Sequence, residues 1–254
     1  MSAVAFVTTH DVVTVEGADA HSYLQSQLSQ DISSIGGLKC QAALLLDPSG
    51  RVDALVRVTY LGLDKFEVDV DPGSGELLLA RLKRFKIRVN AELSLESVPV
   101  VAIRGAGAMS YLDPTHPASR PAWWMNGKAV DVFTSEAPAD LPQISADEYD
   151  AMRIASGWPS MGSEITGKEL AAELGVVDIA VNFGKGCYPG QELVERMDSR
   201  QATSPRTLCR LPANAAVDDA VEITSTSAEF ALAFVKRSAD RNALNAVPVG
   251  PQLI

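Results

Sequence analysis

Apolar and polar positions alternate along several stretches of the chain, and this pattern predicts strands. Residues 12–15, 66–70 and 89–96 carry apolar, β-prone positions, and the last two stretches alternate cleanly with polar side chains. Residues 41–46 and 51–60 are apolar runs on either side of Asp-Pro-Ser-Gly, in which proline at the second position and glycine at the fourth suit a type I turn. We therefore expect antiparallel strands joined by short turns, including one hairpin.

Three other stretches place apolar residues at the spacing of an amphipathic helix. These are residues 20–28, residues 76–85 and residues 145–156, the last of which ends at Gly157. Short apolar runs over residues 207–254 predict a small C-terminal β domain. The order of elements thus predicts an α+β protein with antiparallel strands.

Composition and charge narrow the class of protein and its partners. The chain has 254 residues, 46% of them hydrophobic and 21% charged, which is enough for one large core or two to three small domains. Its start lacks the basic and apolar segments of a secretion signal, and no apolar run approaches the roughly 18–20 residues needed to cross a bilayer, so we expect a cytoplasmic protein without membrane contact. A net charge of −10 disfavours direct binding to nucleic acid.

The cysteines and histidines give no pattern of a resident metal site. Cys40, Cys187 and Cys209 are odd in number and widely spaced, which fits reduced thiols better than a disulfide framework. They lack the short paired spacings of zinc and four-thiolate cluster sites, and the three histidines are equally scattered. We predict no resident metal site in this chain.

Residues 81–88 concentrate five basic side chains in an otherwise acidic chain. Any anionic ligand needs a local basic pocket, and this segment is a candidate for one. The alternative is a solvated helix face whose long side chains cover apolar neighbours. Charge alone leaves both interpretations open.

Residues 185–192, with the sequence Lys-Gly-Cys-Tyr-Pro-Gly-Gln-Glu, are the most informative stretch of the chain. Pro189 suits the first position of a helix, and apolar residues follow at helical spacing, so Cys187 is expected just before a helix N-terminus. A thiolate there would gain from the helix dipole and from the charge of Lys185. The alternative is a tight loop that holds a buried structural cysteine.

This octapeptide resembles the motif of the YgfZ family, folate-binding proteins related to the glycine-cleavage T-protein, an aminomethyltransferase, and implicated in maintaining iron–sulfur enzymes. Residues 182–184 and 193–196, on either side of the motif, also resemble that family. Weaker similarity covers residues 17–31, 44–58, 153–164 and 224–237.

The resemblance implies a T-protein-like folate-binding fold, with two ferredoxin-like α+β lobes and a C-terminal β-barrel around a central hole. The folate-binding region would then comprise residues 1–200, with lobes of roughly residues 1–105 and 106–200 that are allowed to interleave. The β-barrel would comprise residues 201–254.

The resemblance also assigns roles to individual residues. Cys187 would be the catalytic nucleophile or a transient thiolate ligand, and Lys185 would lower its pKa. The rest of the motif loop would give access to the thiol and orient it, through Gly186, Tyr188, Gly190, Gln191 and Glu192. Folate or its anionic groups would meet Asp53, Arg153, Asn182 and Arg196.

Two departures from the T-protein pattern bear on the chemistry. The transferase has a pair of aspartates where this chain has Asp53 followed by alanine, and a solvent-facing Asp53 in a strand is an equally open interpretation. Ala155 stands where the transferase has the glutamate that grips the pterin ring. Because alanine offers neither charge nor acceptor, the replacement counts against a classical aminomethyltransferase.

The resemblance therefore favours an accessory protein that binds tetrahydrofolate or a derivative and supports iron–sulfur cluster assembly or repair, with consequences for tRNA modification. Its partners would be folate and iron–sulfur proteins or their assembly factors, and Cys187 could hold a cluster transiently. A folate-dependent one-carbon transferase is the rival hypothesis. A third is a module that holds folate or a partner protein without using the thiol.

Overall fold

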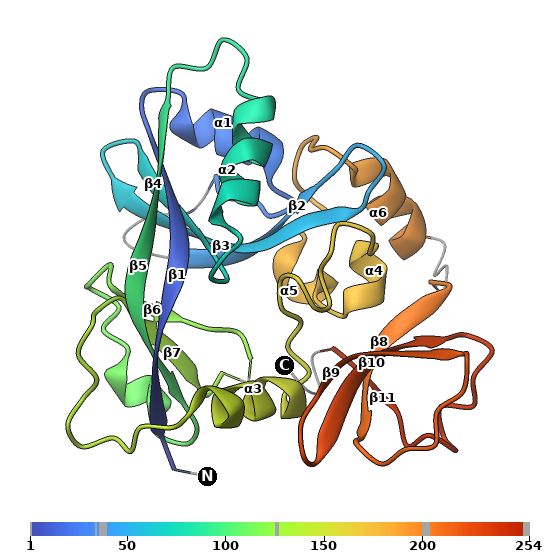
Figure 1. Cartoon of the computed structure of the whole chain (residues 1–254). Coiled ribbons are helices and arrows are strands. Elements are labelled where there is room, and N and C mark those ends of the chain that lie inside the picture. Colours follow the sequence, from blue (N-terminus) through green and yellow to red (C-terminus); the bar gives the residue numbers. More distant parts are fainter. Residues whose placement is uncertain (1, 34, 36–39, 125–126, 200–203, 251–254) are drawn as a thin grey trace.

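The computed structural model describes residues 2–33, 35, 40–124, 127–199 and 204–250. Strands and helices are mixed as far as residue 155, three helices follow within residues 171–199, and the described elements from residue 206 onward are all strands (Figure 1). The elements are, in order, β1 (Val4–Glu16), α1 (Ala20–Gln27), β2 (Cys40–Leu46), β3 (Val52–Gly62), β4 (Lys65–Val70), α2 (Gly75–Arg84), β5 (Glu92–Arg104), the 3-10 helix η1 (Ala108–Tyr111), β6 (Ser119–Pro121), β7 (Ala129–Val132), α3 (Ala146–Ala155), α4 (Ala171–Leu174), α5 (Val177–Ala180), α6 (Gln191–Ser199), β8 (Arg206–Pro212), β9 (Val221–Thr226), β10 (Phe230–Lys236) and β11 (Val247–Pro248).

One seven-stranded sheet organises the molecule, with strand order β2-β3-β4-β1-β5-β7-β6. Its neighbouring strands run antiparallel, and β1 pairs with β5 along its whole length, from Val4 opposite Arg104 to Glu16 opposite Glu92. This pairing explains why β5 continues eight residues beyond the predicted strand end at residue 96. The predicted hairpin is confirmed as β2 and β3, and the turn between them is closed by a hydrogen bond from Gly50 N to the Asp47 carbonyl, 3.0 Å.

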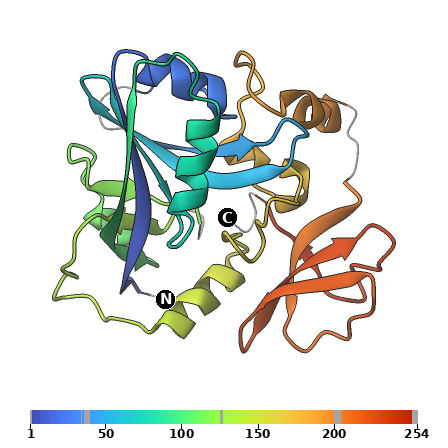
Figure 2. The same cartoon turned by 45° about the horizontal axis from the view of Figure 1, so that its top comes forward.

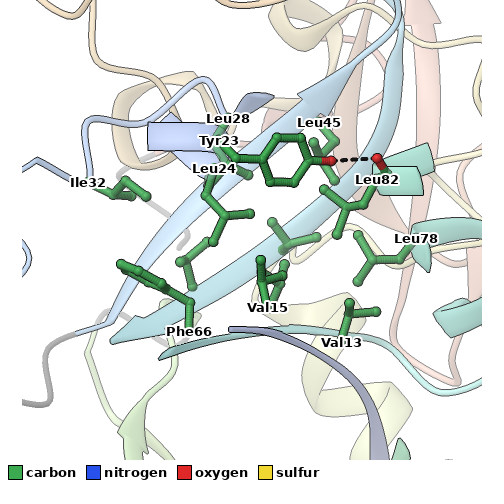
Figure 3. Packing of buried hydrophobic residues seen from close by; sticks show 14 of the residues in the cluster. Val13, Val15, Tyr23, Leu24, Leu28, Ile32, Leu45, Phe66, Leu78 and Leu82 are labelled. Atoms are coloured by element: carbon green, nitrogen blue, oxygen red, sulfur yellow. Dashed lines mark hydrogen bonds between the residues drawn. The ribbon is translucent and has the colours of Figure 1, made fainter. Parts of the chain in front are cut away.

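Helices α1 and α2 cover one face of this sheet. Leu24 of α1 and Leu78 and Leu82 of α2 are fully buried against alternate residues of the strands, such as Val13 (Figure 3). The Tyr23 hydroxyl of α1 donates a hydrogen bond to the carbonyl of Leu82, in the last turn of α2, and so links the two helices. The period-two alternation read from the sequence is therefore what directs these side chains into one core.

The opposite face of β2 faces a second core. Its residues Leu44 and Leu46 pack with apolar residues of α4 to α6 and of a four-stranded C-terminal sheet, whose strand order is β11-β8-β10-β9. In that sheet Leu208 and Phe234 are buried toward the same core. Figure 2 shows the C-terminal strands set apart from the seven-stranded sheet, with α3 crossing below. Closure of the C-terminal strands into a barrel stays a prediction.

The two predicted lobes are joined by the sheet. Strands β6 and β7 come from the second region, and β7 pairs with β5 of the first, with Val101 opposite Val132. The division into ferredoxin-like lobes around a hole stays a prediction. In the part of the chain that the structure describes, no helix combines the length and the apolar character needed to cross a membrane.

Local end signals explain where two helices begin and end. Ser145 caps α3 by accepting a hydrogen bond from Glu148 N, and the Glu148 side chain accepts one from Ser145 N, which forms a capping box. Gly157 follows this helix with a positive φ of 73°. The prediction that the motif helix starts at Pro189 was wrong by two residues, because Gly190 has a φ of 78° that no right-handed helix accommodates, and α6 begins at Gln191.

Candidate functional site

Lys185 fixes the first half of the motif loop to the segment after α1. Its ammonium group is buried and donates hydrogen bonds to the carbonyls of Gln25, Leu28 and Gln30. An ammonium has three N–H donors, so these carbonyls account for all of them. Burial lowers the pKa of Lys185 to about 8, although the Asp31 charge acts in the opposite direction. Lys185 therefore anchors the loop, a role that the sequence did not predict, and its action on Cys187 stays a prediction.

Gly190 fixes the second half of the loop to the β2–β3 turn. A Cβ atom at this position would lie 2.6 Å from the Asp47 carbonyl oxygen and 2.9 Å from Gly50 Cα. Only a residue without a side chain allows this approach at positive φ. Gly186, in contrast, has no atom within 4 Å of where its Cβ would be. The two glycines of the motif thus have different roles, one at a close contact and one in open space.

Tyr188 and Gln191 complete the loop between these anchors. The Tyr188 ring is buried in the second core, 5.3 Å from the Lys185 ammonium, and burial raises the pKa of its hydroxyl to about 12. Tyr188 N donates to the Gln191 side chain, which in turn donates to Glu195 one helical turn later. Glu192 and Arg196 lie on the exposed side of α6. These contacts hold the loop at both ends and leave its middle free.

Cys187 is the accessible thiol of the three. It is exposed, whereas Cys40 is half-buried and Cys209 is buried. Burial raises the pKa of the Cys40 and Cys209 thiols to about 11, which suppresses their thiolate forms at neutral pH. The interpretation of Cys187 as a buried structural cysteine is therefore wrong. It lies between two anchors in a loop that presents it to solvent.

A separate cavity of about 290 Å³ lies on the face of the seven-stranded sheet that α1 and α2 leave uncovered. All three tryptophans of the chain, Trp123, Trp124 and Trp158, line it, so we call it the tryptophan cavity. Trp124 is also part of a small core, with Ala122 and Ala129. A larger, mostly apolar cavity of about 870 Å³ lies between α6 and the C-terminal strands. Cys187 lines neither cavity, so the thiol and the cavities are distinct features.

Buried ion pairs form the floor of the tryptophan cavity. Arg57 Nη2 lies 2.7 Å from Asp69 Oδ1, and Arg57 Nη1 lies 2.9 Å from Asp131 Oδ2. Arg104 Nη2 is 2.7 Å from the other oxygen of Asp131, and Arg120 Nη1 is 3.3 Å from Asp69. Burial alone would raise the pKa of both aspartates, but the neighbouring guanidinium charges hold it below the usual range. These side chains alternate with core residues along their strands, which directs them to one face.

The predicted folate-binding residues are not brought together. Arg153 of α3 lines the tryptophan cavity, but four of its N–H groups are used by the Asp150 and Glu164 carboxylates, the Trp158 carbonyl and the Ser225 hydroxyl. Asp53 pairs with Arg81 of α2, at 2.8 Å, outside this cavity. Asn182 lies just before the motif loop, where its side chain accepts a hydrogen bond from Gly184 N, and Arg196 is exposed on α6.

Within the basic segment 81–88, the structure separates one residue from the others. Arg81 is buried and occupied by Asp53, Gln27 and the Leu46 carbonyl. Lys83, Arg84 and Arg88 are exposed, and Lys86 is half-buried. The solvated helix face therefore describes Lys83 and Arg84, whereas Lys86 and Arg88 lie beyond the end of α2, and none of these residues lines the tryptophan cavity.

Comparison with known proteins places these features in context. No protein-family model matches the chain. An uncharacterized protein of Haemophilus influenzae is 24% identical over 206 residues, which covers 80% of this chain and 71% of that protein. The tRNA-modifying protein YgfZ of Escherichia coli O157:H7 is 25% identical over 216 residues, covering 75% of this chain and 66% of the relative. The chain is similar to the YgfZ proteins, as its motif predicted.

A third relative of the YgfZ-like chain is a mitochondrial iron-sulfur cluster assembly factor IBA57 homolog of Neurospora crassa, 25% identical over 233 residues. That match covers 80% of this chain and 52% of the relative, so the chain spans between about half and 71% of the lengths of these three proteins. Among solved structures, the glycine cleavage system aminomethyltransferase T of Bartonella henselae superposes with a TM-score of 0.75, 15% identity, and coverage of 92% of this chain and 79% of that one. The mixed α/β fold is therefore T-protein-like.

Of the residues that line the tryptophan cavity, sequence reasoning proposed Arg153 as a ligand contact but missed the charged residues of the strands. Arg57 and Asp131 interrupt otherwise apolar strands, and this was the available signal, because a charge in a buried strand needs a partner. Asp71, directly after β4, also lines the cavity. Among the described residues, no group of three or more histidine, cysteine or acidic side chains is arranged to hold a metal ion.

Proposed function

We propose that this protein binds tetrahydrofolate or a derivative and, through Cys187, supports the assembly or repair of iron–sulfur clusters on other proteins. The observation that carries the proposal is the exposure of Cys187 in a loop anchored at Lys185 and Gly190, on a T-protein-like fold. A thiol that served packing alone would be buried, as Cys209 is.

The tryptophan cavity is the proposed folate site. Its volume of about 290 Å³ is close to the lower end of the roughly 300–1,000 Å³ of small-molecule sites, which suits a bicyclic head group with the rest of the ligand outside. Its lining combines aromatic faces with a few fixed polar groups, the combination that binds and orients flat heterocycles. This supports the cavity as the place for the pterin ring.

An accessory role is favoured over one-carbon transfer. The Ala155 carbonyl accepts a hydrogen bond from Arg210, and its methyl group is not among the groups that line the tryptophan cavity. The residue that replaces the pterin-gripping glutamate thus offers nothing to a ligand. Cys187 lies outside the cavity as well, so thiol and pterin would act in separate steps or with a partner between them.

One exposed thiol can supply only one of the four ligands that an iron–sulfur cluster takes, so the remaining ligands would come from a client protein or an assembly factor. The names of the YgfZ and IBA57 relatives support this class of partner. An effect on tRNA modification would be indirect, through iron–sulfur enzymes that modify tRNA, because the charge of −10 opposes RNA binding.

The proposal is tested by titrating the purified protein with tetrahydrofolate in a calorimeter and following the alkylation rate of its thiols. We expect saturable binding, together with rapid alkylation at one site that is lost in Cys187→Ser. Methylenetetrahydrofolate formed from an aminomethyl donor would instead establish the transferase.

The role of the thiol is tested in cells that lack the protein. Cys187→Ser should fail to restore the activity of iron–sulfur enzymes, and the matched control Cys40→Ser should restore it, because Cys40 is half-buried in β2. Full restoration by Cys187→Ser would refute the role of Cys187 in this proposal.

A further inference from the structure

Four aspartates line the tryptophan cavity, and three of them are neutralised by arginines. Asp69 is paired with Arg57 and Arg120, and Asp131 with Arg57 and Arg104. Asp150 accepts a hydrogen bond from Arg153 Nε at 2.6 Å and is 52% exposed. Asp71 is the fourth, and it forms no ion pair with the described residues.

Asp71 is nevertheless held in place. It follows the end of β4 two residues after Asp69, so the alternation of the strand directs both carboxyl groups to the cavity side. Its Oδ2 accepts a hydrogen bond from Met161 N at 2.9 Å, across the cavity wall. A carboxylate offers about four acceptor positions on its two oxygens, so one backbone donor leaves most of them free. The cavity thus contains one fixed carboxyl group with unused acceptors.

We propose that Asp71 recognises the N–H edge of an aminopyrimidinone ring, the part of a pterin that carries the 2-amino group and the adjacent ring N–H. This inference rests on the proposed folate binding and names the residue that takes the place of the missing glutamate. The two donors of that edge are parallel, and a carboxylate can accept both at once, as it does from arginine. Ala155 cannot make this contact, whereas Asp71 lines the cavity and has the acceptors for it.

The other three aspartates are poorer choices on energetic grounds. Turning Asp69 or Asp131 toward a ligand would break ion pairs between side chains that are at most 5% exposed. Breaking a buried pair is strongly destabilising because a charge is left buried without its partner. The Asp150 side chain is half exposed and already pairs with Arg153, so water would compete with a ligand for its remaining acceptor positions.

The surroundings of Asp71 favour a ligand that brings hydrogen-bond donors. Burial raises the pKa of the Asp71 carboxyl, and the nearby Asp69 charge adds to this, while His10 and Arg153 act in the opposite direction together with Met161 N. An ionised Asp71 is therefore short of stabilising partners among the described residues. N–H donors from a ring would supply them, and the ring faces would contact aromatic side chains of the lining such as Trp158.

The test compares tetrahydrofolate with an analogue that carries a methyl group in place of the 2-amino group, by calorimetric titration of the full chain and two variants. Asp71→Ala and Asp71→Asn should weaken tetrahydrofolate binding by roughly 10- to 100-fold, since hydrogen bonds to a charged group are lost or mismatched. Asp71→Asn keeps an acceptor for Met161 N, so it preserves the local fold if Asp71→Ala does not. Asp64→Asn, at an exposed aspartate that does not line the cavity, is the matched control and should change binding by less than about threefold.

The analogue separates recognition from general damage. Wild type should bind it more weakly than tetrahydrofolate, by a smaller factor than the loss in Asp71→Ala because the ring N–H remains, and that variant should no longer distinguish the two ligands. If the variants bind tetrahydrofolate as tightly as wild type does, or still distinguish it from the analogue, Asp71 does not bind the N–H edge. The proposal that the protein binds folate would be unaffected by that result. If wild type binds no tetrahydrofolate, the proposed function fails and this inference fails with it.

Discussion

The two glycines of the motif loop offer a matched pair of substitutions in one octapeptide. Gly190 has a φ of 78°, and an added Cβ would meet the Asp47 carbonyl oxygen at 2.6 Å. Gly186 lies outside the positive-φ region and has no neighbour within 4 Å of an added Cβ. Gly190→Ala and Gly186→Ala therefore add the same methyl group in opposite surroundings.

The cost at Gly190 has two parts. An L-residue in the left-handed region costs roughly 1–2 kcal/mol. Relief of a contact with rigid backbone costs about 1–3 kcal/mol more, as overpacking does in cores. The loop carries Tyr188 and leads into α6, and both Tyr188 and Val194 of α6 are buried in the second core. The loop therefore cannot shift to relieve the contact without disturbing this core. We expect Gly190→Ala to lower the free energy of unfolding by about 2–5 kcal/mol.

Urea denaturation followed by circular dichroism measures this difference. Gly186→Ala should change the free energy of unfolding by less than about 0.5 kcal/mol, as surface substitutions usually do. Equal stability of the two variants within that margin would mean that Gly190 does not hold the loop against the β2–β3 turn. Of the two proposed anchors of the Cys187 loop, only Lys185 would then remain.

Two further predictions concern charges. Asp131→Asn should lower the free energy of unfolding by about 3–5 kcal/mol near pH 7, because it breaks a buried ion-pair network. Glu16→Gln, which removes the exposed pair with Lys65, should lower it by only about 0–1 kcal/mol. The stability difference between Asp131→Asn and wild type should shrink as the pH falls below roughly 4, because the pKa of Asp131 is lowered in the folded protein. Equal effects of the two variants in urea denaturation would contradict the buried network. The pKa of Lys185 is lowered to about 8, so between about pH 8 and roughly pH 10.4 the unfolded chain binds a proton at this residue that the folded protein has released. The free energy of unfolding of wild type, relative to that of Lys185→Met, should therefore rise over this pH range. A flat or falling difference would contradict the burial of the Lys185 ammonium group.

The chain itself determined the local elements and the motif. Alternation over residues 66–70 predicted β4, the Asp-Pro-Ser-Gly turn predicted the β2–β3 hairpin, and Gly157 predicted the end of α3. These signals act over a few residues, through backbone preferences and the side to which each side chain points. They suffice for these elements, whereas the full length of β5 depends on its pairing with β1. The motif, read as a whole, also indicated the similarity to YgfZ proteins.

The tertiary structure alone decided the partners of buried charges. Arg57 and Asp131 meet because the strand order places β3, β4, β1, β5 and β7 side by side in a curved sheet, although 74 positions separate the two residues. Lys185 finds its carbonyl acceptors about 155–160 positions away, near α1, and not at Cys187 two residues along. A buried charge takes whichever partner the packing of distant elements brings within a few ångströms, because desolvation makes an unpaired charge costly. That choice is made by long-range packing, and no local pattern of residues contains it.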